Sequence, residues 1–363
     1  MDCLLIVTPL RFRPLPWMRR LLQASGDDVI AACQVTLMPV LIAAGCPPWC
    51  ESTPIIMAKR KLLIDVDCGI DDAQALMIAL ASPEAEVLGI TCCFGNATID
   101  HVCKNVLRVL QVCNKMEIPV FRGTSCSLLS EGRHVYSHFG GDGLGDAGDP
   151  TSPGLEYLQK EDAVHALIRI INAHPGQISL VALGPLTNLA LAVKLNPTLP
   201  KMLNKLYIMG GNLEGRGNRT ICAEFNFALD PEAAYIVLND FTCPTYIATL
   251  EFARENSLTM EFFKDWVNQD SVKARFMKTI TARCLPQNNQ FVSYDSFAMA
   301  AALDESVILE YLECAVTVEL KGNFTRGMLI LDLNDKLKKE QKVFLMKKCN
   351  LEKFKEQIWS ALQ

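Results

Sequence analysis

The residues that point most directly to chemistry are the four aspartates of the segment Asp65-Val-Asp67-Cys-Gly-Ile-Asp71-Asp72. They come at the end of a short apolar run, residues 61–66, so we expect them at the turn between a strand and a helix. Carboxylates so close together repel one another strongly unless a cation lies among them. A set of ligands made only of oxygen atoms suits a hard cation, Ca²⁺ or Mg²⁺, better than zinc.

Two other interpretations of this segment remain open. Asp71 and Asp72 could simply cap the helix, because the positive end of the helix dipole tolerates negative charge. Asp65 followed by Asp67 is also the pattern of haloacid-dehalogenase-type phosphatases, in which the first aspartate, here Asp65, would be the nucleophile. Gly69 stands where those phosphatases usually carry Thr or Val, and the second pair of aspartates is additional to their pattern.

The elements that would position these side chains alternate between strand and helix. We expect strands at 61–66, 87–94, from 119 onward, 178–182 and 204–209, helices at 71–81, 101–112, 161–173 and 186–195, and a Gly- and Asp-rich loop at 134–153. This order predicts an α/β fold with a mainly parallel, Rossmann-like sheet and helices on both faces. In such sheets ligands bind at the carboxyl ends of the strands.

The composition narrows the class of protein. The 363 residues are 50% hydrophobic and 21% charged, with a formal net charge of −5. The chain has no long basic run and no apolar stretch long enough for a bilayer, so we expect no nucleic-acid or membrane partner. The fifteen cysteines are odd in number and mostly lie in apolar runs, as Cys92, Cys93 and Cys103 do. We therefore expect buried free thiols in a cytoplasmic protein.

Residues 1–58 differ from the remainder of the chain. They contain basic and proline-rich pieces, an apolar stretch at 29–44 and a Cys/Pro-rich linker. Residues 4–7 are too short for a signal-peptide core and are followed, not preceded, by arginines. We expect a poorly ordered N-terminal extension before one domain at 59–363, and a transit peptide remains an alternative.

Further segments, in the same order along the chain, resemble the inosine–uridine nucleoside hydrolase family. They are Ile90-Thr-Cys-Cys-Phe-Gly-Asn96, Leu183-Gly-Pro-Leu-Thr-Asn188, Met209-Gly-Gly, Ala223-Glu224-Phe-Asn226-Phe-Ala-Leu-Asp230, Tyr294-Asp295 and Thr325-Arg-Gly-Met. With the aspartate segment they cover roughly residues 59 to 360. The resemblance implies the nucleoside hydrolase fold, a hydrolase that cleaves the N-glycosidic bond of ribonucleosides, and a homodimer or homotetramer.

The resemblance also implies the residues of the site. Ca²⁺ would be held by the side chains of Asp67, Asp72 and Asp295 and by the backbone carbonyl of Leu183. The residues that would contact the ribose, or lie next to it, are Asp71, Asn96, Met209, Asn218, Glu224 and Asn226. Asp67 would also take a proton from the calcium-bound water that attacks C1′. Carboxylates around the ribose would stabilise the oxocarbenium-like transition state.

The side of the site that receives the base departs from the family pattern. Many members carry His before the last metal-binding Asp, where this chain has Tyr294, and a second His position is Phe139, with His138 beside it. Tyr294 and His138 are therefore the candidate leaving-group acids, and a phenol is a weaker acid than an imidazolium. Three outcomes remain open: hydrolysis of ordinary nucleosides, for instance purine ones stacked on Phe139, Phe291 or Tyr294; an unusual ribosyl substrate; or a catalytically silent protein that binds a ribosyl ligand.

Overall fold

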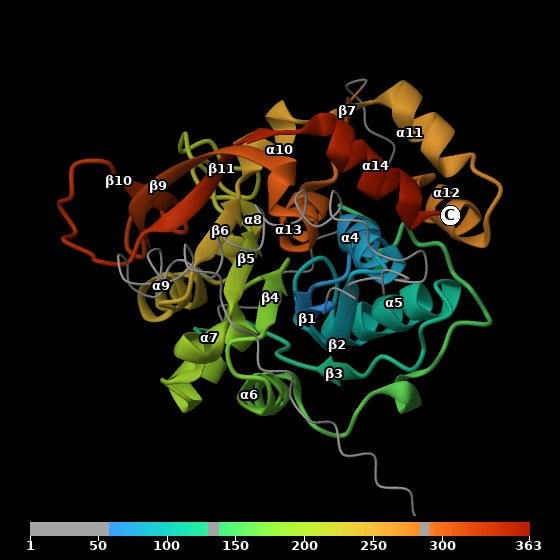
Figure 1. Cartoon of the computed structure of the whole chain (residues 1–363), viewed down its shortest axis with the longest axis horizontal. Helices are drawn as coiled ribbons and strands as arrows, with labels where there is room; N and C mark the ends of the chain where they lie inside the picture. Colours follow the sequence, from blue (N-terminus) through green and yellow to red (C-terminus); the bar gives the residue numbers. More distant parts are fainter. Residues whose placement is uncertain (1–57, 130–137, 284–289) are drawn as a thin grey trace, which may run out of the picture. The chain divides into compact units, whose positions relative to one another are not determined.

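Short apolar segments that are buried on both faces form the centre of a nine-stranded sheet. The computed structural model describes residues 58–129, 138–283 and 290–363 (Figure 1). The strands of this sheet are β1 (Arg60–Val66), β2 (Ala85–Cys92), β3 (Val120–Arg122), β4 (Ile178–Ala182), β5 (Lys205–Met209), β6 (Thr245–Ala248), β9 (Ile308–Val318), β10 (Leu329–Asp332) and β11 (Val343–Cys349). All five residues of β4 are buried, as are the last five of β1, as expected for central strands of a covered sheet.

The order of the strands is β10-β9-β11-β6-β5-β4-β1-β2-β3. From β3 across to β11 every neighbouring pair is parallel, and β9 and β10 extend the sheet as antiparallel strands. The chain thus passes from β1 outward to β3 on one side and from β4 outward on the other. The reversal of direction between β1 and β4 places the first aspartates at the switch point, where α/β sheets bind ligands.

Helices cover both faces of the sheet (Figure 1). The helices are α4 (Ile70–Ala81), α5 (Ile99–Val112), α6 (Ala163–Ala173), α7 (Thr187–Leu195), α8 (Phe225–Leu229), α9 (Pro231–Asp240), α10 (Leu250–Glu255), α11 (Met260–Val267), α12 (Val272–Thr281), α13 (Tyr294–Leu303) and α14 (Leu351–Ala361). Short 3₁₀ turns occur at Leu155–Tyr157, Leu199–Met202 and Glu305–Val307, and β7 (Leu258–Thr259) pairs with β8 (Gln290–Phe291). One apolar cluster contains residues of α4, α5, α13 and α14, and a second contains residues of α6, α7 and α9.

The predicted alternation of strands and helices is confirmed, with small shifts at the ends. The helix expected at 161–173 begins at Ala163 because Asp162 is its N-cap and accepts hydrogen bonds from two backbone amides. The strand expected at 87–94 ends at Cys92. The described part of the predicted loop, residues 138–153, contains no helix or strand. The predicted N-terminal extension, residues 1–58, lies outside the described residues except for Ala58, and the described elements belong to the compact unit Met57–Gln363.

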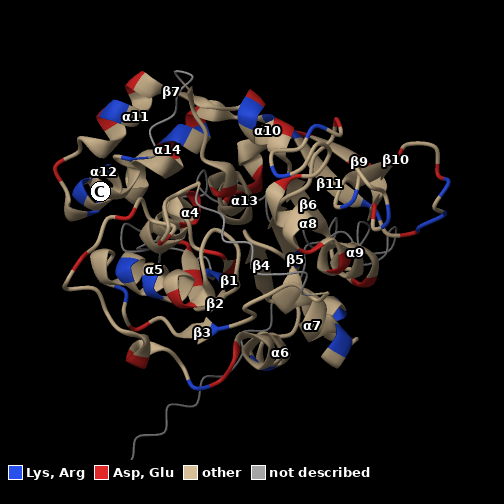
Figure 2. Ribbon diagram, turned by 180° about the vertical axis from the view of Figure 1, so that it is seen from behind, with Lys and Arg blue, Asp and Glu red and all other residues tan. Residues whose placement is uncertain are grey.

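The thiols and charges of the described residues are distributed as follows. All ten described cysteines are free thiols, and seven of them are buried. Figure 2 shows Lys and Arg on the outer helices α5, α7, α10 and α11. Within the described ranges, no helix combines the length and the apolar character that a membrane span requires.

Candidate active site

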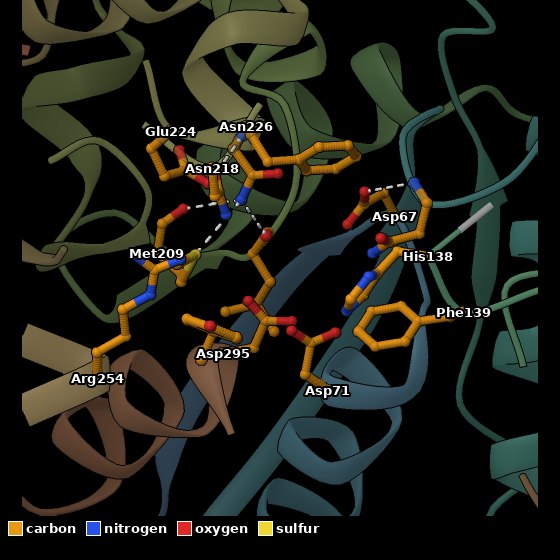
Figure 3. Close-up of a pocket in the computed structure, with 14 residues that line it drawn as sticks. Asp67, Asp71, His138, Phe139, Met209, Asn218, Glu224, Asn226, Arg254 and Asp295 are labelled. Atoms are coloured by element: carbon orange, nitrogen blue, oxygen red, sulfur yellow. Dashed lines mark hydrogen bonds between the residues drawn. The ribbon is translucent and has the colours of Figure 1, made fainter. Parts of the chain in front are cut away.

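A cavity of about 310 Å³ lies at the carboxyl ends of the central strands (Figure 3). Its size is within the range of small-molecule sites. The residues that line it are Asp67, Asp71, Asn96, His138, Phe139, Leu183, Met209, Asn218, Glu224, Phe225, Asn226, Arg254, Tyr294 and Asp295. Most of them directly follow a strand or begin a helix, so the termini of several elements build one site.

Eleven of the twelve residues predicted for the site line this cavity, and the twelfth, Asp72, is fully buried next to it. Phe139, suggested as a stacking surface for the base, also lines it, and the two remaining lining residues were not predicted. Phe225 lies inside a segment that carries the family resemblance, so that segment was a signal for it. Arg254 belongs to no such segment, and no sequence pattern pointed to it.

The side chains of Asp71, Asp72 and Asp295 form an acidic cluster whose oxygens lie within 4.8 Å of one another. One oxygen of Asp72 accepts hydrogen bonds from the backbone amide of Gly69 at 2.9 Å and from the side chain of Asn96 at 3.3 Å. The other oxygen of Asp72 and one oxygen of Asp71 are buried and have no hydrogen-bond partner among the described residues. Asp72 thus caps α4 as the simpler interpretation expected, and it also presents a free oxygen that fits a hard cation.

Burial raises the pKa of every carboxyl group in this region. It raises the pKa of Asp72 to about 6, and burial together with the charge of Asp72 raises that of Asp71 to about 8. The pKa values of Asp67 and Asp295 also lie well above the ordinary value, first through burial and then through repulsion by neighbouring aspartates. Ionising this group near neutral pH is therefore unfavourable unless a cation compensates the charge.

Asp67 lies in the same cavity but outside the group of three. Its Oδ2 atom accepts a hydrogen bond of 2.8 Å from the backbone amide of Asn96. A Cβ atom on Gly95 would lie 1.9 Å from this oxygen, so only glycine permits the approach. The structure thus brings the aspartates Asp67, Asp71, Asp72 and Asp295 to one site. Asp71, which was not among the predicted metal ligands, groups with Asp72 and Asp295.

The amide of Asn226 ties the ends of two strands together. Its Nδ2 atom donates to the carbonyl of Leu183 at 2.7 Å and to that of Met209 at 3.0 Å. Leu183 follows β4 and Met209 ends β5, so one side chain fixes the spacing of both carbonyls. The carbonyl of Leu183, predicted to bind calcium, lies on the cavity and already accepts this hydrogen bond.

Glu224 is the N-cap of α8 and is 1% exposed. Its carboxylate accepts hydrogen bonds from the backbone amides of Asn226 at 2.9 Å, Gly211 at 2.8 Å and Phe227 at 3.2 Å. Burial raises its pKa to about 7 despite these donors. The side chain predicted to contact ribose therefore also holds α8 and the turn after β5 in place.

His138, Phe139 and Tyr294, which were predicted for the side that receives the base, line the cavity. The rings of His138 and Phe139 are 4.8 Å apart in an edge-to-face arrangement. A Cβ atom on Gly69 would lie 2.7 Å from the ring of Phe139, so this glycine is required for the close approach of the ring. The stacking role suggested for Phe291 is wrong, because that ring is buried, packs 4.8 Å from Phe263, and does not line the cavity.

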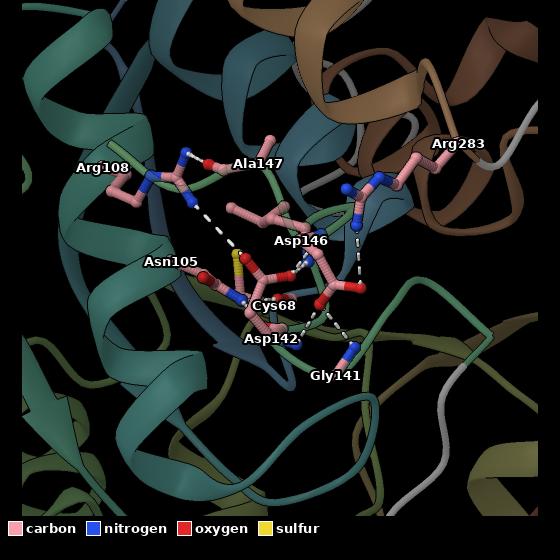
Figure 4. Close-up of polar contacts among 9 residues, drawn as sticks. Cys68, Asn105, Arg108, Gly141, Asp142, Asp146, Ala147 and Arg283 are labelled. Carbon is pink, nitrogen blue, oxygen red and sulfur yellow. Dashed lines mark hydrogen bonds and ion pairs between the residues drawn. The ribbon is translucent and has the colours of Figure 1, made fainter. Parts of the chain in front are cut away.

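The turn that carries Phe139 is attached to the first aspartate segment by Asn105 of α5 (Figure 4). The Nδ2 atom of Asn105 donates to the carbonyl of Cys68 at 2.9 Å and to that of Asp142 at 2.8 Å. The side chain of Asp142 accepts a hydrogen bond from the amide of Asp146 at 2.9 Å. The side chain of Asp146 accepts hydrogen bonds from the amides of Gly141 and Asp142, so the turn is closed by its own hydrogen bonds.

Asp65, the nucleophile in the phosphatase interpretation, is not on the cavity. It is 0% exposed, and its Oδ1 atom accepts hydrogen bonds from Thr91 at 2.5 Å and Asn188 at 2.8 Å. Burial raises its pKa to about 7. A carboxyl group enclosed in this way cannot reach a substrate, so the phosphatase interpretation is wrong.

Comparison with known proteins gives one consistent result. The family described as inosine-uridine preferring nucleoside hydrolase matches residues 62–356. The inosine-uridine preferring nucleoside hydrolase of Crithidia fasciculata is 31% identical over 84% of this chain and 98% of its own length. A probable uridine nucleosidase 2 of Arabidopsis thaliana is 40% identical over 51% of this chain and 56% of its own length. The solved structure of an inosine-guanosine nucleoside hydrolase superposes with a TM-score of 0.79 at 32% identity, over 84% of this chain and 99% of that one.

The fold, the acidic cavity and these similarities define a hydrolase that acts on the N-glycosyl bond of nucleosides. The chain belongs to the inosine-uridine preferring nucleoside hydrolase family. The predicted family, fold and enzyme class are thereby confirmed.

Proposed function

We propose that the chain hydrolyses ribonucleosides to ribose and free base in a calcium-dependent reaction in the cytoplasm. The observation that carries the proposal is one cavity in which the acidic cluster of Asp71, Asp72 and Asp295 lies beside the amides of Asn96 and Asn226. Buried carboxylate oxygens without partners suit a hard cation. Fixed amides and carboxylates beside that cation suit the hydroxyl groups of a sugar.

The residues that would hold the ion are Asp67, Asp72, Asp295 and the carbonyl of Leu183. Calcium bound there would supply a binding point for the vicinal diol of ribose and would acidify a water molecule. Asp71 lies on the cavity wall with one oxygen unpartnered, which supports a further contact to the ion or the diol.

Asp67 would act as the general base. Its Oδ2 atom is held by the amide of Asn96, which fixes the carboxylate while the side chain faces the cavity. The acidic side chains around the ribose would stabilise the positive charge that develops on the sugar as the base leaves.

The base would lie against Phe139 and Tyr294, whose aromatic rings favour a purine. Names of similar proteins include an inosine-guanosine and an inosine-uridine nucleoside hydrolase, so purine nucleosides are the first substrates to examine. The tyrosine at 294, where family members often carry histidine, favours a second candidate: a protein that binds the ribosyl group and releases base slowly or not at all.

The test measures free base released from inosine, guanosine and uridine by the full-length chain, with excess calcium and with chelator. We expect release only with calcium, none from 2′-deoxyribosides, and release at least about a hundredfold slower with Asp67→Asn. Tight binding of ribose without release of any base would support the second candidate. Release that is unaffected by chelator would refute the calcium proposal.

A further inference from the structure

Arg254 is the one Lys or Arg among the described residues that line the cavity. Its guanidinium is exposed and makes no hydrogen bond or ion pair within the described part of the chain. Four of the residues that share this lining are carboxylates, Asp67, Asp71, Glu224 and Asp295. An arginine on the wall of an acidic cavity that pairs with none of these carboxylates is available to an anionic ligand.

The position of Arg254 is fixed by contacts of α10 with the turn after β5. The amide of Leu250 donates to the carbonyl of Gly211 at 3.0 Å. The carboxylate of Glu251 accepts from the amides of Leu213 at 2.8 Å and Glu214 at 3.0 Å. Arg254 follows Glu251 by one helical turn on the same face. Because the carboxylate of Glu251 accepts hydrogen bonds from these backbone amides, it forms no ion pair with Arg254, which lies beside the segment that leads to Asn218.

Arg254 lies at one end of the cavity, and His138 and Phe139, two of the side chains proposed for the side that receives the base, lie at the other. Figure 3 shows Arg254 near Met209, across the cavity from His138 and Phe139. In a ribose ring, C1′ and C4′ lie on opposite sides of the C2′–C3′ edge. If that edge lies on the acidic cluster and C1′ carries the base toward Phe139, C4′ and its C5′ substituent point toward Arg254.

We propose that Arg254 binds an anionic group on the 5′ carbon of the ribosyl ligand, so that the substrates include nucleoside 5′-monophosphates. This inference rests on the proposed function, because it uses the same orientation of the ribose. A guanidinium forms paired, charge-assisted hydrogen bonds with phosphate oxygens. The acidic cavity disfavours an anion, so the contribution of Arg254 to binding a monophosphate exceeds its contribution to binding a neutral riboside.

The experiment compares kcat/KM for inosine and inosine 5′-monophosphate in the full-length protein with calcium. In the wild type we expect both compounds to be cleaved. Arg254→Gln is expected to lower kcat/KM for the monophosphate about tenfold to a hundredfold and to change that for inosine less than about threefold. Arg254→Lys retains the charge, and its kcat/KM for the monophosphate is expected to fall between those of the wild type and Arg254→Gln. Arg216→Ala is the matched control, because Arg216 lies near Asn218 in sequence, is 84% exposed, and pairs with Glu214 away from the cavity lining.

Binding of ribose 5-phosphate and of ribose, measured by calorimetry, separates this inference from the proposed function. We expect ribose 5-phosphate to bind to the wild type at least about tenfold more tightly than ribose does, and we expect this preference to disappear in Arg254→Gln. Cleavage of inosine but not of its monophosphate, or equal effects of Arg254→Gln on both compounds, would overturn the inference. If neither compound is cleaved, the proposed function fails, and the calorimetry alone decides whether Arg254 recognises an anion.

Discussion

The acidic cluster makes stability depend on pH in opposite ways with and without a cation. Carboxyl groups whose pKa is raised in the folded state bind more protons when folded than when unfolded. The metal-free protein should therefore lose stability as the pH rises through the raised pKa values. Calcium binds the ionised carboxylates, so the stabilisation that it provides should grow over the same interval.

The magnitude follows from Asp71 and Asp72. Asp72 is fully buried with a pKa of about 6, and its ionisation between about pH 5 and 6 costs about 1.4 kcal/mol. Asp71, with a pKa of about 8, would cost about 4 kcal/mol between about pH 5 and 8 if it were fully enclosed. Its side chain is half-buried, and solvent screening reduces this to about 2 kcal/mol. The sum, about 3 kcal/mol, corresponds to a change in Tm of about 5 to 10 °C.

The assay is thermal unfolding of the full-length protein at about pH 5 and about pH 8, with chelator or with excess calcium. We expect the gain in Tm from calcium to be larger at the higher pH by about 5 to 10 °C. Asp65 and Glu224 also titrate in this interval, but they do so in both samples, so the calcium difference isolates the cluster. Asp72→Asn should abolish the gain, whereas Asp270→Asn, which removes a fully exposed carboxylate paired with Arg275, should leave it intact. An equal gain at both pH values, or a larger one at the lower pH, would refute the reasoning.

Three further predictions concern single residues. Asp67→Asn should lower kcat about a hundredfold or more while calcium still raises Tm, as expected for loss of a general base; unchanged turnover would exclude that role. Tyr294→His should raise kcat for inosine about tenfold or more by supplying a stronger acid, and no change would count against the missing-acid argument. Gly145→Ala should cost clearly more stability in denaturant than Gly176→Ala: both glycines have φ +71°, which costs about 1 to 2 kcal/mol for alanine. Only at Gly145 would the new Cβ also lie 2.1 Å from a backbone oxygen, that of Ile280, so equal losses would show that this contact relaxes freely.

The fold could be predicted because its determinants are local in the sequence. Apolar runs such as 178–182 bounded by turns and followed by amphipathic helices specify parallel strands with helical crossovers. Carboxylates placed directly after such a strand must meet the other strand ends at one edge of the sheet. The position of the cavity and most of its lining therefore follow from the order of the elements.

Details set by distances between remote segments could not be predicted. The closer grouping of Asp71 with Asp72 and Asp295 depends on how α13 packs against α4, which no local pattern encodes. Arg254 reaches the cavity only because contacts between α10 and the turn after β5 fix that helix. Phe291 was expected near the base, but apolar packing against Phe263 is more favourable for a phenyl ring than exposure in a polar cavity.

The single amide of Asn105, which bridges the carbonyls of Cys68 and Asp142, divides the pocket into two parts of unequal tolerance. The sugar-facing part is built from strand termini that belong to the core, so a substitution there disturbs the whole architecture. The base-facing turn is held from outside the cavity by Asn105, by Arg108, which donates to the carbonyl of Ala147 at 2.6 Å, and by Arg283, which pairs with Asp146. Exchanges of the side chains of His138 or Phe139 leave these contacts untouched. The range of bases accepted can thus be altered by redesigning a few exposed side chains, while the machinery for the sugar stays as it is.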